Sequence, residues 1–148
     1  MVVRDVLDNG LRLLTESIEA GRTSGDDALA AHGAVLRELV RLDHDPQWNP
    51  LPARATAERA MSTFEALGDD LGLARALILS EQVAASSGDR GAARQLLERA
   101  LAHAREAGAR REEADILNLL GGVICWGQDR IEDAAAFCEE LIEWTEGH

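Results

Sequence analysis

The chain repeats part of its own sequence at a spacing of 40 residues. The residues of the first copy are Ala53, Arg54, Glu58, Arg59, Ala60 and Gly68. Their counterparts in the second copy are Ala93, Arg94, Glu98, Arg99, Ala100 and Gly108. A less regular echo follows at a spacing of 41, with Ala134, Glu139 and Leu141. A period of this length is typical of stacked helical repeats, in which each unit buries its apolar face only against its neighbours. The repeat therefore predicts an all-α chain that presents an extended surface.

The 3.6-residue periodicity of the apolar side chains predicts seven helices. Their expected ranges are about 3–20, 24–42, 52–67, 71–86, 90–106, 111–125 and 130–145. Gly21 is the expected end of the first helix, and Ser24 with Asp27 fits a capping box at the start of the second. We expect one domain over residues 1–148, in which the repeat evidence is strongest over 51–146 and additional helices occupy 1–50.

The composition is that of a folded domain outside the membrane. Apolar residues make up 46% of the 148 residues, which is ordinary for a globular chain. No apolar run approaches the roughly 20 residues that span a bilayer. Met1 to Asp5 do not begin a secretory signal peptide. We therefore expect a soluble protein of the cytoplasm that makes no membrane contact.

The formal net charge is −12, from 27 acidic and 15 basic residues. All of the basic residues are Arg, which favours a bacterial genome of high GC content. An acidic chain is poorly suited to bind nucleic acid directly, because such binding needs clustered cations. The charge instead favours solubility and a basic or polar protein partner.

The two cysteines, Cys125 and Cys138, fall within apolar helical patterns. We expect both to be free, buried residues, because an intracellular chain rarely forms structural disulfides. Their spacing does not match a zinc site.

The sequence contains no arrangement of residues that predicts catalysis. The histidines are His32, His44, His103 and His148. The segment Asp43-His44-Asp45 has the chemistry of metal ligands, but its place before Pro46 is typical of a solvated turn. We therefore expect no enzymatic activity, no bound metal and no cofactor.

A small-residue pattern recurs after two of the expected helix ends. Gly88-Asp89 is followed by Ala93, Leu97 and Ala100. Gly127-Gln128 is followed in the same way by Ala134, Cys138 and Leu141. Over residues 51–146 this pattern resembles tetratricopeptide repeats of the longer bacterial kind. Similar repeats occur in large bacterial regulators, such as LuxR-type ATP-binding activators and proteins with nucleotide-cyclase domains. The resemblance implies a right-handed superhelix of antiparallel helix pairs.

The resemblance also implies a groove lined by the first helix of each pair, which takes a peptide or a partner helix. The implied groove residues are Arg75, Gln82, Ser86, Asp115, Asn118 and Gly122. Arg75 has the chemistry to pair with a carboxylate, and Gln82 and Asn118 have the chemistry to bond an extended backbone. The same residues also fit ordinary solvated or inter-repeat positions. We therefore expect a non-catalytic protein–protein interaction module that serves as a regulatory scaffold.

Two other functions fit the same pattern. The first is an effector-sensing repeat domain of a bacterial transcriptional regulator or cyclase, although the low aromatic content disfavours a small-molecule pocket. The second is a self-association module. In that hypothesis, Phe137, Leu141 and Trp144 form an apolar C-terminal face through which the chain makes a homodimer.

Overall fold

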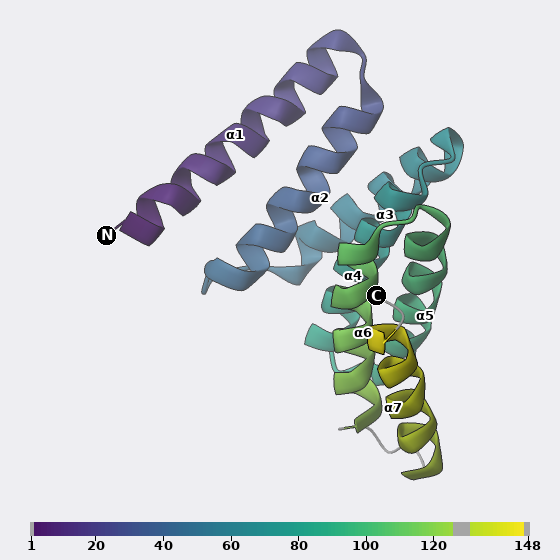
Figure 1. Ribbon diagram of the computed structural model, residues 1–148. Coiled ribbons are helices and arrows are strands. Elements are labelled where there is room, and N and C mark those ends of the chain that lie inside the picture. The colour runs from purple at the N-terminus through teal and green to yellow at the C-terminus, as the bar shows by residue number, and fades with distance from the viewer. Residues whose placement is uncertain (1, 126–130, 147–148) are drawn as a thin grey trace.

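The computed structural model describes residues 2–125 and 131–146, and these residues form seven α-helices and no strand (Figure 1). The helices are α1 (Val2–Ser24), α2 (Asp27–His44), α3 (Pro50–Leu67), α4 (Asp70–Ser86), α5 (Arg90–Glu106), α6 (Arg110–Cys125) and α7 (Ile131–Glu146). The expected all-α class is confirmed. The turn expected at Gly127-Gln128 lies outside the described residues.

Carboxylate and amide side chains begin four of the helices. Asp26, Asp69 and Asp89 accept hydrogen bonds from the backbone N–H groups of Leu29, Gly72 and Ala92. Asn49 caps α3 in the same way, directly before Pro50. These contacts satisfy N–H groups that lack a partner within the helix.

The predicted boundary between the first two helices is wrong. α1 continues through Ser24, and Gly25 follows with a left-handed φ of 73°. The cap of α2 is therefore Asp26, and Ser24 does not form the predicted capping box. Gly21 does not end α1. It is buried, and a Cβ at this position would lie 2.6 Å from the backbone nitrogen of Ala30. This glycine is required because α1 and α2 approach closely here.

The helices stack in chain order, and each packs against the next. α4 also contacts α2, and α6 also contacts α4. Within the described chain, α1 contacts α2 and no other helix, so the α1–α2 hairpin projects at one end (Figure 1). Each even-numbered helix from α4 onward therefore rests on both helices of the pair before it.

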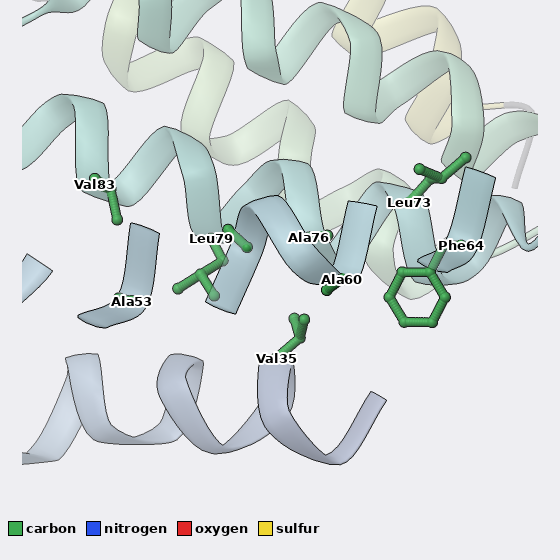
Figure 2. Close-up of a cluster of buried hydrophobic side chains, with 9 residues drawn as sticks. Val35, Ala53, Ala60, Phe64, Leu73, Ala76, Leu79 and Val83 are labelled. Carbon is green, nitrogen blue, oxygen red and sulfur yellow. The ribbon is translucent and has the colours of Figure 1, made fainter. Parts of the chain in front are cut away.

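The first core cluster joins α2, α3 and α4 (Figure 2). Its buried residues are Val35, Ala53, Ala57, Ala60, Phe64, Leu73, Ala76, Leu79 and Val83. Alanines contribute most of the α3 side, which allows the α3 and α4 backbones to approach closely. Phe64 is the large side chain that fills the remaining space, and it is completely buried.

The second core cluster joins α4, α5 and α6. Its buried residues are Ala74, Leu77, Leu97, Ala100, Leu101, Ala104, Ile116, Leu117 and Leu120. α4 contributes to both clusters through two of its faces.

α7 is covered on one face only, because its backbone packs beside α6 and beside no other described helix, and α5 reaches it only through the Arg105–Glu140 contact. Cys138 is consequently exposed, contrary to the prediction that it is buried. Ile142, on the same helix, is 56% exposed. The side chain of Cys125 lies outside the described part of the chain.

No helix in the described part of the chain is both long enough and apolar enough to cross a bilayer.

Gly72 provides a test of the α3–α4 packing. A Cβ at this position would lie 2.4 Å from the ring of Phe64. We expect Gly72→Ala to destabilise the chain by about 1–3 kcal/mol, because the completely buried Phe64 ring would have to shift to admit the new methyl group. Thermal denaturation followed by circular dichroism measures the effect.

Gly10→Ala is the matched control, because a Cβ built there has no atom within 4 Å apart from its chain neighbours and the nearby backbone of its own helix. This change is expected to stabilise α1 by roughly 0.5–1 kcal/mol. Equal melting temperatures for the two variants would contradict the packing described here.

Candidate partner-binding groove

A groove of about 460 Å³ opens between α2, α4 and α6. Its lining consists of Leu36, Leu39, Val40, Leu42, Asp43 and His44 of α2, Arg75, Ile78 and Gln82 of α4, and Arg111, Glu112, Asp115, Asn118 and Leu119 of α6. Apolar side chains from all three helices therefore alternate with charged and amide groups. We call this feature the α2–α4–α6 groove.

The structure brings four of the six predicted groove residues together. Arg75, Gln82, Asp115 and Asn118 all line the α2–α4–α6 groove. Ser86 does not line it, because its hydroxyl donates to the carbonyl oxygen of Val83 at 2.7 Å near the end of α4. Gly122 is exposed and is not part of the lining either.

Sequence reasoning missed the α2 wall of this groove. Leu36, Leu39, Val40 and Asp43 follow the i, i+3, i+4, i+7 spacing, which places them on one face of α2. The stripe was visible as an apolar face. Its role as a groove wall was not visible, because that role depends on α2 packing beside α4.

Arg75 forms a bridge between two walls of the groove. Its Nε and Nη2 atoms donate to the same Oε1 of Glu112, at 2.9 Å and 2.5 Å. Both side chains are largely buried, with 26% and 13% of their surfaces exposed. The carboxylate that we expected a ligand to supply is therefore already provided by α6.

Two histidines hold the start of α4 from opposite sides. His32 of α2 lies 2.7 Å from a carboxylate oxygen of Asp69, and His103 of α5 lies 2.7 Å from one of Asp70. Partial burial acts to raise the pKa of Asp69. The Gly72 N–H and the His32 ring outweigh that effect and hold the pKa below its usual value. The N-terminal end of α4 is thus held to α2 and to α5.

The segment after α2 begins the loop beside the groove. Asp45 accepts from the Gln47 N–H and from Arg41, and both contacts lower the pKa of its carboxyl group. Asp43 and His44 are exposed. Residues 2–125 and 131–146 contain no group of three or more His, Cys, Asp or Glu side chains arranged to hold a metal.

The residues of the self-association hypothesis lie against the core. Phe137, Leu141 and Trp144 are partly buried and pack on the second core cluster. Arg105 of α5 fastens α7 further, because it donates to Glu113 of α6 and to Glu140 of α7. A second copy of the chain would meet only the outer edges of these three apolar side chains. That hypothesis stays a prediction.

Glu81 of α4 is a buried carboxyl group outside the groove lining. Only 3% of its surface is exposed, and its Oε2 atom has no hydrogen-bond partner. It follows Leu77 by one helical turn, so it shares the face that enters the second core cluster. Burial raises the pKa of Glu81 to about 7.

No family model, curated protein or solved structure matches the chain.

Glu81 predicts a pH dependence of stability. The pKa of its carboxyl group is about 7 in the folded chain against an ordinary 4.5, so the folded state binds the proton more tightly. The associated stability is fully present below about pH 4.5 and is lost as the pH rises through about 7. We expect Glu81→Gln to stabilise the chain by about 1–3 kcal/mol at pH 8 and by much less at pH 5.

Thermal melts at the two pH values measure this difference. The control is Glu65→Gln, which changes an exposed carboxylate on α3. A Glu81→Gln effect of the same size at both pH values would show that the Glu81 carboxyl group is not titrating in this range.

Proposed function

We propose that the chain is a tetratricopeptide-like solenoid, and that it is a non-catalytic module that holds a peptide segment of a partner protein in the α2–α4–α6 groove. The observation that carries this proposal is which helices form the walls of the groove. If α2–α3, α4–α5 and α6–α7 are taken as pairs, the walls are the first helices of consecutive pairs. Such a surface is the concave side of a repeat array.

The packing order supports the repeat arrangement. α4 rests on both α2 and α3, and α6 rests on both α4 and α5. The same relation therefore occurs twice along the chain, as a repeated unit requires. The 40-residue sequence spacing falls on α3 and α5, the second helices of two consecutive pairs.

The lining of the groove suits a peptide. Leu36, Leu39, Val40, Ile78 and Leu119 provide apolar contact area for a side chain of the partner. Gln82 and Asn118 can both donate to and accept from a peptide backbone. Among the described residues, no Phe, Tyr or Trp lines the groove. The effector-sensing alternative is weaker for this reason, because small-molecule sites are commonly lined by aromatic side chains.

The cellular setting forms part of the proposal. A partner-binding repeat module of this size suits a larger bacterial regulator of the cytoplasm. The acidic composition and the helical repeats support that setting.

The groove can be tested by filling it without changing its charge. Asn118 is exposed and lines the groove, so Asn118→Trp places a bulky neutral side chain there. The probe is a display library of random dodecapeptides selected on the immobilised wild-type chain. We expect the selected peptides to lose at least about tenfold in affinity for Asn118→Trp, measured by fluorescence anisotropy.

Ala102→Trp is the matched control, because Ala102 is exposed on α5 and lies outside the groove. It should bind the selected peptides as the wild type does, and both variants should retain the wild-type circular dichroism spectrum. Failure to enrich any peptide would refute the proposed function, and so would equal affinity for the wild type and Asn118→Trp.

Self-association is a second candidate, and the packing of α1 favours it. Val6 and Leu13 of α1 are 67% and 51% exposed. Their spacing of seven residues places them on one stripe of α1, which packs beside α2 and beside no other helix of the described chain. A second copy of the chain would cover this stripe.

Light scattering across a concentration range tests this candidate. We expect a concentration-dependent dimer that the double variant Val6→Glu/Leu13→Glu abolishes, because each new carboxylate would have to be desolvated. Abolition by Trp144→Glu instead would assign the contact to the C-terminal face. A monomer at every concentration would contradict both forms of self-association.

A further inference from the structure

We infer that the partner segment in the α2–α4–α6 groove is cationic, with a Lys or Arg side chain close to an apolar anchor. The inference rests on the proposed function and specifies the chemistry of its ligand. It follows from three properties of the lining: the balance of charge, the end of α2 and the spacing between carboxylates and apolar groups.

The balance of charge in the groove is negative. The lining contains the carboxylates of Asp43, Glu112 and Asp115 against the guanidinium groups of Arg75 and Arg111. Arg75 and Glu112 neutralise each other across the α4–α6 contact. In the part of the chain that the structure describes, no ion pair within 4.0 Å engages Asp43 or Asp115. These two are therefore the lining carboxylates that form no ion pair, and a cationic ligand at Asp115 would compete with Arg111, which lies one helical turn away.

Arg111 does not make the groove receptive to an acidic ligand. It is exposed in the first turn of α6, four residues before Asp115. This i, i+4 spacing places the Asp115 carboxylate within reach of Arg111 on the same helix face. An anionic ligand at Arg111 would therefore meet a resident carboxylate nearby.

The end of α2 adds to the negative potential. Asp43 and His44 occupy its last turn and line the groove. The last carbonyl groups of a helix carry a partial negative charge, which favours a cation nearby. Of the carbonyl groups in this last turn, the one of Arg41 accepts a hydrogen bond from the Asp45 N–H. The backbone and the Asp43 side chain thus act in the same direction.

Each free carboxylate lies one helical turn from an apolar lining residue. Asp43 follows Leu39 by four residues, and Asp115 precedes Leu119 by four residues. Side chains four apart on a helix lie roughly 5–6 Å from each other at Cβ. An extended peptide places residues i and i+2 on one side at roughly 7 Å. A ligand with an apolar side chain and a Lys or Arg two residues away matches this spacing.

The electrostatic field of the whole chain also favours a cationic ligand. The net charge of −12 attracts a cationic segment at long range and raises its rate of encounter. This field alone would favour cations over the entire surface. The test must therefore separate the groove carboxylates from the total charge.

The first experiment reads the sequences of the dodecapeptides selected on the wild-type chain. We expect Lys and Arg to be enriched over Asp and Glu, with a cation next to or two residues from Leu, Ile or Val. The second experiment measures the selected peptides against the double variant Asp43→Asn/Asp115→Asn. Their affinity should fall by about tenfold, which is typical of losing charge pairs at an interface.

The matched control is the double variant Glu65→Gln/Glu106→Gln, which removes the same charge from exposed positions outside the groove. We expect less than about a threefold change, because screened charges at a distance act weakly. A control loss as large as that of the groove variant would overturn the inference and assign the binding to the overall field.

The remaining outcomes separate this inference from the proposed function. Enriched peptides without a cation, or with acidic residues, would overturn the cationic preference and leave the groove function standing. No enriched peptide would remove both. A concentration-dependent dimer that Asn118→Trp abolishes would make a second copy of the chain the occupant and overturn the cationic peptide.

Discussion

α4 is buried between α2 and α3 on one side and α5 and α6 on the other. Among the described residues it is the one helix that contributes fully buried side chains to both core clusters. Its two apolar faces are separated by a narrow strip that carries Arg75, Ile78 and Gln82 into the groove. Helices α2 and α3 are therefore held apart from α5 and α6 by the diameter of α4. Small residues at the contacts, such as Ala74 and Ala76, set that distance close to the minimum for packed helices.

The groove is a consequence of this arrangement. Helices α2 and α6 both pack on α4, on opposite sides of the strip. Because they do not contact each other in the described chain, the surface of α4 between them stays accessible. The Arg75–Glu112 pair and the His32–Asp69 contact fix the two outer walls to the central one. Partly buried polar contacts of this kind specify register more than they add stability.

The sequence was sufficient to predict the helices and part of the groove. Apolar periodicity located all seven elements, because apolar residues recur at helical spacing wherever a helix buries one of its faces. The resemblance to tetratricopeptide repeats, and not the periodicity, implied Gln82 and Asn118 as groove residues, and both line the α2–α4–α6 groove. The α2 wall was missed, because an apolar stripe does not reveal whether it is covered by another helix. Cys138 was misplaced for the related reason that one helix covers α7 where the pattern suggested more.

Other details depend on contacts between residues distant in the chain. Arg75 meets Glu112 across 37 positions, and no local pattern selects that partner among the many acidic residues. The role of Gly21 is likewise invisible in the sequence, because its lack of a side chain matters only where the Ala30 backbone approaches it. Glycine near the end of a helical pattern usually indicates a stop, and here the true stop is Gly25, four residues later.

The attachment of α1 has a mechanical consequence. One face of α2 forms a wall of the groove, and another face packs against α1. α1 has 23 residues, so it is a rigid arm roughly 35 Å long. A tilt of α2 by about 5° displaces the far end of such an arm by about 3 Å. Any tilt of α2 would thus become a larger displacement at the far end of the hairpin. The position of α1 is therefore coupled to the position of the groove wall through α2.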